Sequence, residues 1–223
     1  GGVVGSIIES GCLKEGIRSR FFRIEGESRI NTIVVYEARG DALVVNEPGP
    51  AMSGEEVRGV IDFFKSAVDP SDELVISGTG PVGFSPENLI EIVDHASRLG
   101  IAVKADIGGA WLERIVERKL DTLKINSEEL MTAFGISSSD YSSLCDFKAE
   151  FGIGCLVITR GNEGSVALAP DGSAYGASAD DPVSDIAVGC GDSFFAGLLC
   201  GAGRGLPFEK SLGLACACGY ANT

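Results

Sequence analysis

The chain has 223 residues, of which 44% are hydrophobic and 22% are charged, proportions that indicate a globular protein and argue against a disordered one. Its formal net charge of −14 argues against partners that are nucleic acids or anionic membrane surfaces, because both repel an acidic protein. No apolar run in the sequence reaches the roughly 18–20 residues of a membrane span.

The seven cysteines are scattered along the chain and form no C-x-x-C pair. This usage indicates reduced thiols and predicts a cytoplasmic protein. The single histidine argues against a histidine-based zinc site and against a Ser-His-Asp triad.

The first fifty residues predict a short helix followed by a small sheet. The helix is expected within residues 1–17, with Gly16 as its stop. Three β-rich runs follow at 21–26, 30–38 and 42–49, with polar turns at 26–29 and 39–41 between them. We expect these short strands to form a unit distinct from the rest, which divides the chain into residues 1–51 and residues 52–223.

From Ser53 onward, strands and helices alternate. Ser53 with Glu56, and Ser85 with Pro86, mark the starts of two helices. The remaining pattern predicts a buried strand at 74–77 and further strands at 101–106, 122–124 and 155–159. It also predicts helices at 110–118, 127–134 and from about 140, and a hairpin across 171–172. Such alternation predicts an α/β fold in which a mostly parallel sheet carries helices on both faces.

The stretch AVGCGDSFFAG, residues 187–197, is the strongest candidate for a functional site. Gly189 and Gly191 flank Cys190, and a nearly all-apolar helix is expected from about Gly191, so unpaired N–H groups would face an anion. Asp192 would lie in the first helical turn, within reach of a hydroxyl group beside that anion. The alternative is that Asp192 only stabilises the helix that it begins.

Other motifs each allow a structural and a functional interpretation. Residues 78–83 match G-x-G-x-x-G, but Pro81 and the helix signals after Gly83 favour a loop beside a cleft over a dinucleotide site. Asn126 is either an ordinary helix cap or, with Glu129, part of a Mg²⁺ site that includes water. Lys104 either pairs with Asp106 or meets an anion.

Several of these motifs resemble those of the ribokinase-like (PfkB) carbohydrate kinases. The matching segments are GCGDSFFAG (189–197), KINSEEL (124–130, with Ile125 where the family has proline), TRGNEG (159–164) and DIGG (106–109, with Gly108 where serine is usual). The resemblance implies a Rossmann-like α/β domain with a small β lid, and it implies ATP and Mg²⁺ as cofactors.

The same resemblance implies a role for each matching residue. Asp192 would be the catalytic base, and the N–H groups of Gly189, Cys190 and Gly191 would hold the transferring phosphoryl group. Glu129 and Asn126 would organise Mg²⁺, Asn126 through water. The expected nucleotide-binding residues are Lys124, Asn126, Thr159, Gly161, Gly164 and Asn222, and the expected substrate-binding residues are Arg29, Lys104, Asp106 and Asp192.

The segments GESRIN (26–31) and NEPGP (46–50) resemble the phosphosugar branch of the family, 1-phosphofructokinase and tagatose-6-phosphate kinase. In that branch the arginine, here Arg29, binds the phosphate already present on a ketohexose, for which its planar guanidinium is suited. The resemblance also implies a possible homodimer through the lid. It further implies that the family's N-terminal segment, and an end beyond Thr223, are missing from the sequence as written.

Three alternatives remain open at this point. The chain could be a kinase of the same fold for an unphosphorylated sugar or nucleoside, or a non-catalytic sensor of nucleotide or sugar phosphate. The third alternative is the dinucleotide-dependent enzyme suggested by residues 78–83.

Overall fold

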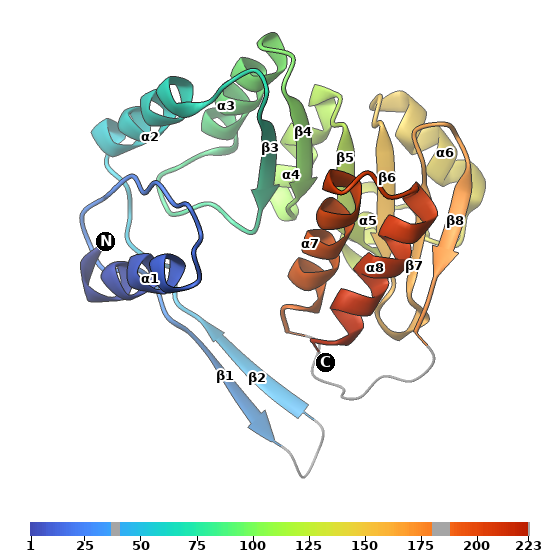
Figure 1. Ribbon diagram of the computed structural model, residues 1–223, viewed down its shortest axis with the longest axis horizontal. Helices are drawn as coiled ribbons and strands as arrows, with labels where there is room; N and C mark the ends of the chain where they lie inside the picture. The colour runs from blue at the N-terminus through green and yellow to red at the C-terminus, as the bar shows by residue number, and fades with distance from the viewer. Residues whose placement is uncertain (37–40, 180–187, 223) are drawn as a thin grey trace.

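The computed structural model describes residues 1–36, 41–179 and 188–222, and Figure 1 shows how its elements are arranged. Six strands form the main sheet in the order β3-β4-β5-β6-β7-β8. The strands β3 to β6 are parallel, and β7 and β8 are antiparallel to their neighbours. Their bounds are β3 Glu73–Ser77, β4 Ala102–Asp106, β5 Thr122–Asn126, β6 Cys155–Thr159, β7 Ser165–Leu168 and β8 Ala174–Ala177.

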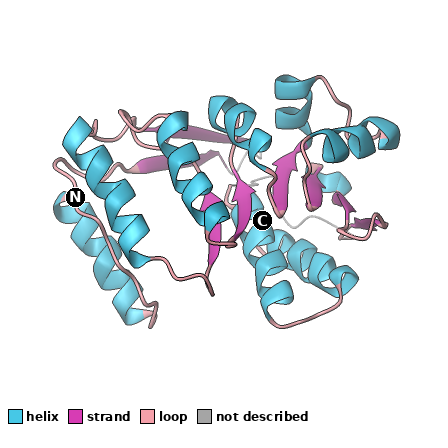
Figure 2. Cartoon of the chain, turned by 90° about the horizontal axis from the view of Figure 1, so that it is seen from above, coloured by secondary structure: helices cyan, strands magenta, loops and turns pink. Residues whose placement is uncertain are grey.

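Helices cover the sheet on two sides, as Figure 2 shows from above. One side carries α2 (Gly54–Ala67), α3 (Pro86–Arg98), α4 (Gly109–Ile115), α5 (Ser127–Phe134) and α6 (Tyr141–Glu150), which pack with one buried cluster of apolar residues. The other side carries α7 (Cys190–Gly203) and α8 (Phe208–Tyr220), which pack with a second cluster on β6 and β7. The expected mostly parallel sheet with helices on both faces is therefore confirmed.

The predicted helix starts are confirmed because they depend on local hydrogen bonds. The hydroxyl of Ser53 accepts from the N–H of Glu56, whose carboxylate accepts in return from the N–H of Ser53. Ser85 makes the same reciprocal pair with Asn88, and Pro86 occupies the first turn. These caps satisfy N–H groups that a helix cannot pair internally.

The N-terminal part contains α1 (Gly2–Lys14) and a hairpin of β1 (Asn31–Tyr36) and β2 (Asp41–Asn46). The strand expected at 21–26 is wrong. The Phe22 ring lies 5.9 Å from that of Phe63 on α2, and the N–H of Glu25 donates to Glu56 at 2.6 Å. This run follows the surface of α2, so its apolar residues pack on a helix rather than in a sheet. The turn expected at 39–41 falls largely outside the described residues.

The expectation that β3 is a buried strand is also wrong. It is the edge of the main sheet, and its exposure alternates along the strand, with Val75 43% exposed. Within the described ranges, every helix is too short or too polar to traverse a lipid bilayer. The division at residues 51 and 52 stays a prediction.

Candidate active site

The N-terminus of α7 has the geometry of an anion-binding site. Gly189 precedes the helix with a φ of 82°, a left-handed conformation that glycine adopts without steric cost. The first N–H groups of any helix lack intrahelical acceptors and attract negative charge. Asp192 lies exposed in the first turn. The helix expected after this glycine hinge is therefore confirmed, although Ala187 lies outside the described residues.

The end of α8 fastens this hinge. The Asn222 side-chain amide donates to the carbonyl of Val188 at 3.0 Å, and the Cys190 thiol lies 3.5 Å from the carbonyl of Asn222. A Cβ atom on Gly189 would lie 3.0 Å from the Asn222 amide nitrogen. The structure thus places Asn222 at the hinge, where it holds the backbone that leads into α7.

A buried ion pair lies directly behind the N-terminus of α7. The Lys124 ammonium is 3.0 Å from each carboxylate oxygen of Asp106, and the two side chains are 7% and 12% exposed. A Cβ atom on Gly191 would lie 2.9 Å from the Lys124 ammonium nitrogen. A positive charge therefore stands against the first turn of α7.

Two further carboxylates act on this pair. Burial raises the pKa of Asp106, the Lys124 ammonium opposes that rise, and the charges of Asp192 and Glu129 add to it. Asp192 and Glu129 are therefore close enough in space to act on Asp106, although the three residues come from three different elements. The site carries more negative than positive charge, an arrangement that favours binding of a cation.

Lys104 takes neither partner expected from the sequence. Its ammonium lies 2.6 Å from Glu73 at the start of β3, so the side chain points back toward the amino ends of the strands. The expected Lys104–Asp106 pair is wrong because Asp106 already binds Lys124 with both oxygens. Lys104 also lies away from the N-terminus of α7 and is not part of the candidate site.

Asn126 and Glu129 form the capping box of α5. The N–H of Glu129 donates to the Asn126 side chain at 2.8 Å, and the N–H of Asn126 donates to Glu129 Oε2 at 3.0 Å. The second oxygen of Glu129 faces Gly108, where a Cβ atom would lie 2.7 Å away. In the described part of the chain, no three His, Cys, Asp or Glu side chains are grouped to hold a metal ion. A metal here would need water or substrate oxygens as further ligands.

A cavity of about 490 Å³ collects five of the six residues that the sequence assigned to a nucleotide, and Asn222 is the one that does not line it. Seven of the expected residues line it: Lys124, Asn126, Thr159, Gly161, Gly164, Cys190 and Gly191. The sequence analysis gave no role to the other lining residues, which are Ser127, Glu128, Asn162, Ala179, Phe194, Cys216, Gly219 and Tyr220. Ser127, Glu128, Asn162 and Phe194 lie within the matching segments, whereas Ala179 and the three residues on α8 lie outside them.

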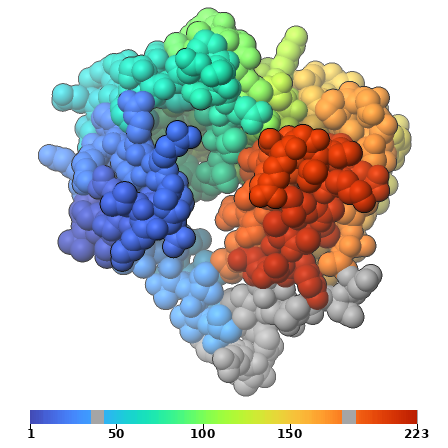
Figure 3. All heavy atoms as spheres, in the orientation of Figure 1, coloured from blue at the N-terminus to red at the C-terminus, as the bar shows by residue number. Residues whose placement is uncertain are grey.

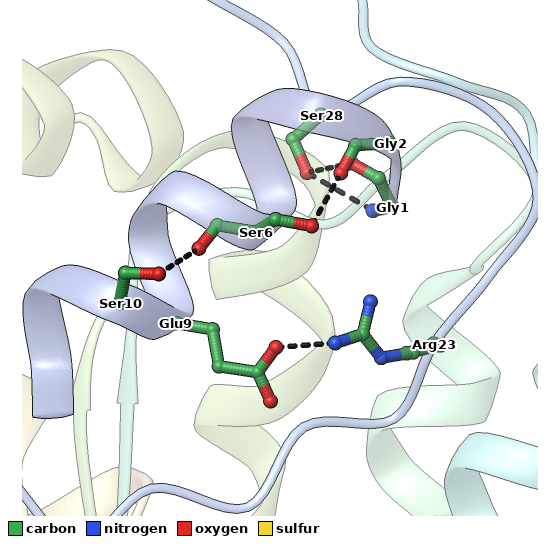
Figure 4. A network of polar contacts seen from close by, with 7 residues as sticks. All are labelled: Gly1, Gly2, Ser6, Glu9, Ser10, Arg23 and Ser28. Atoms are coloured by element: carbon green, nitrogen blue, oxygen red, sulfur yellow. Dashed lines mark hydrogen bonds and ion pairs between the residues drawn. The ribbon is translucent and has the colours of Figure 1, made fainter.

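The GESRIN segment is anchored to the start of α1. Glu27 accepts from the N–H groups of Val3 and Val4 at 3.0 and 2.8 Å, and these bonds hold the pKa of its carboxyl below the usual value. The N-terminal amino group donates to the Ser28 hydroxyl at 3.0 Å. Figure 4 shows the Ser28 contact and, farther along α1, the ion pair that Glu9 of the helix makes with Arg23. This anchoring fixes the backbone immediately before Arg29.

Arg29 joins three segments that are separate in the sequence. Its guanidinium donates to the Thr79 hydroxyl at 3.1 Å. Gly49 lies beside its stem, and the next residue, Ile30, donates its N–H to Glu47 at 2.9 Å. GESRIN, NEPGP and the loop at 78–80 therefore meet at one place, and Thr79 is a contact that the motifs did not single out.

The loop at 78–83 borders a second cavity, of about 480 Å³, as the preferred interpretation expected. Helix α3 begins only at Pro86, beyond the last glycine of the loop. No helix start lies within the glycines, so the loop lacks the geometry that would hold a dinucleotide pyrophosphate. Figure 3 shows the molecule hollowed between the N-terminal segment, in blue, and α7 and α8, in red.

Comparison with known proteins agrees with this geometry. The family model described as pfkB family carbohydrate kinase matches residues 1–223. A curated 1-phosphofructokinase of Bacillus subtilis is 26% identical over 224 residues, which cover 99% of this chain and 72% of the relative. The structure of Escherichia coli phosphofructokinase-2 with substrates and products has a TM-score of 0.89 at 21% identity, over 99% of this chain and 73% of that one. The structure of a possible 1-phosphofructokinase of Thermotoga maritima has a TM-score of 0.84 at 21% identity, over 100% of this chain and 72% of that one.

Proposed function

Because the chain belongs to the pfkB family of carbohydrate kinases, we propose that it transfers the terminal phosphoryl group of ATP to a hydroxyl of a ketohexose phosphate. Fructose 1-phosphate and tagatose 6-phosphate are the proposed substrates, and the product is a bisphosphate. The observation that carries this proposal is the cavity that seven expected residues line, with Asp192 in the first turn of the helix that forms one wall.

The reaction follows from the arrangement around α7. Asp192 accepts the proton of the attacking hydroxyl, whose oxygen bonds to the terminal phosphorus of ATP while ADP leaves. The N–H groups at the start of α7 and the Lys124 ammonium bind the oxygens of the transferring group, where negative charge accumulates. Mg²⁺ held near Glu129, with Asn126 bound through water, supplies further charge neutralisation when it is present.

Arg29 sets the substrate class in this proposal. Its guanidinium is exposed and held beside the loop at 78–80 by Thr79, so it offers remaining N–H donors to a phosphate. The B. subtilis relative named 1-phosphofructokinase supports a sugar phosphate as substrate.

The test is coupled ADP release by the natural full-length protein with Mg-ATP. Fructose 1-phosphate, tagatose 6-phosphate, fructose 6-phosphate and fructose are compared side by side. We expect turnover with phosphorylated sugars alone, lost in Arg29→Ala. Turnover with plain fructose would place the protein in another branch of the family, and ATP binding without turnover of any sugar would indicate a sensor.

We also propose that the hairpin β1–β2 forms a homodimer. Ile33, Val35 and Val44 share one face and Val34, Leu43 and Val45 the other, and all six side chains are 40–51% exposed. A two-stranded ribbon that is apolar on both faces is stable only when something covers it. Sedimentation should give a dimer that Val34→Lys converts to monomer, and a monomeric wild type would contradict the proposal.

We also propose that the protein is located in the cytoplasm. All seven cysteines lie in the described ranges and none is paired in a disulfide. This cysteine usage supports the cytoplasm, where thiols stay reduced.

A further inference from the structure

We propose that Asp106 is a positioning residue, which holds the Lys124 ammonium against the first turn of α7 and so makes this lysine part of the cradle for the transferring phosphoryl group. The inference rests on the proposed kinase reaction. It replaces the substrate-binding role that sequence resemblance gave to Asp106 with a role through Lys124.

The register of the sheet sets up this contact. Asp106 ends β4 and is the register partner of Lys124 on the parallel strand β5, so both side chains leave the same face of the sheet. Val157, the register partner of Lys124 on β6, packs in the apolar cluster beneath α7 and α8. The shared face is therefore the one that carries α7.

The pair leaves Lys124 little freedom. Both oxygens of Asp106 lie 3.0 Å from the ammonium, and both side chains are largely buried. A buried lysine without such a partner would lose its charge or turn toward water. Asp106 therefore decides the position of the ammonium.

Gly191 gives independent support, because its backbone does not require glycine. Its φ lies outside the positive region, whereas Gly189 has a φ of 82°. A Cβ atom on Gly191 would lie 2.9 Å from the Lys124 nitrogen, closer than a side-chain carbon can approach. The absence of a side chain at Gly191 thus makes room for the ammonium against the N-terminal turn, where it adds to the positive end of the helix dipole.

The pair of Lys104 with Glu73 provides a matched control on the same strand. Lys104 shares the face of Asp106 on β4, and its ammonium also binds a carboxylate. That pair lies toward the amino ends of the strands, away from α7. Charge pairing alone is therefore common to both lysines, and only the Asp106 pair places an ammonium at the anion site.

The experiment measures turnover and nucleotide binding in the full-length protein carrying Asp106→Asn, Asp106→Glu, Gly191→Ala or the control Glu73→Gln. We expect Asp106→Asn and Gly191→Ala to lower kcat about 10²-fold, since a displacement of about 1 Å can cost that much. The KM for the sugar phosphate should stay near the wild-type value, Asp106→Glu should recover part of kcat, and Glu73→Gln should match wild type. In calorimetric titrations we expect the wild type to bind ATP more tightly than ADP, and we expect Asp106→Asn and Gly191→Ala to lose that difference.

Each alternative result has a definite meaning. A raised KM for the sugar phosphate with unchanged kcat in Asp106→Asn would make Asp106 a substrate ligand and overturn the inference. If that variant does not fold, unchanged kcat and ATP preference in Gly191→Ala would overturn it instead. If the wild type phosphorylates no sugar, the kinase proposal fails separately, and the ratio of ATP to ADP affinities in the variants still decides the role of Asp106.

Discussion

Replacing Lys124 by methionine should destabilise the protein far more than replacing Lys104 by methionine. Methionine keeps most of the apolar stem of either lysine and removes only the ammonium. The two lysines are 7% and 12% exposed, so the residues replaced are nearly matched. The difference lies in the carboxylate left behind, because Asp106 is 12% exposed and Glu73 is 55% exposed.

The magnitude follows from that difference. At an effective dielectric constant of about 20, unit charges 3.0 Å apart attract by about 5.5 kcal/mol, and removing one partner of a buried pair costs about 3–5 kcal/mol. Lys124→Met should therefore lower the free energy of unfolding by about 3–5 kcal/mol at pH 7. Lys104→Met should lower it by less than about 1 kcal/mol, because Glu73 regains contact with water.

Urea denaturation followed by circular dichroism measures both values. The double variant Lys124→Met/Asp106→Asn should recover most of the loss, because no unpaired charge then remains buried. Equal losses in the two single variants would refute the reasoning that burial of the remaining carboxylate sets the cost.

Two further predictions concern the same site. Asp192→Asn should lower kcat by roughly 10²–10⁴ while nucleotide affinity by titration stays near wild type, and unchanged turnover would remove Asp192 as the base. The raised pKa of Asp106 means that its carboxyl binds a proton more tightly in the folded than in the unfolded protein. Its contribution to stability is therefore greatest at low pH and falls as the pH rises from the ordinary value of 3.8 through the raised pKa. The urea midpoint of the wild type minus that of Asp106→Asn, measured across this pH range, should decrease as the pH rises. A difference that does not change with pH would contradict the raised pKa of Asp106.

The sequence by itself determined the elements whose cause is local. The caps at Ser53, Ser85 and Asn126 each use a partner three residues away, and the turn into α7 uses the positive φ of Gly189. The loop at 159–164 could likewise be predicted, because its glycines lie between two strands that pair with each other. Interactions over so few residues do not depend on how the sheet is assembled.

Only the tertiary structure decided which distant groups meet. Asp106 and Lys124 are 18 residues apart. The sequence suggested Lys104 as the partner of Asp106, whereas the register of β4 with β5 sets Asp106 beside Lys124. The run at 21–26 has the composition of a strand, yet it packs on α2 because an aromatic ring offers similar apolar contact to a helix or a sheet. The lack of a side chain at Gly191 on α7 is likewise explained by Lys124, which lies on β5. The geometry of the whole fold decides which of several contacts of comparable strength are made.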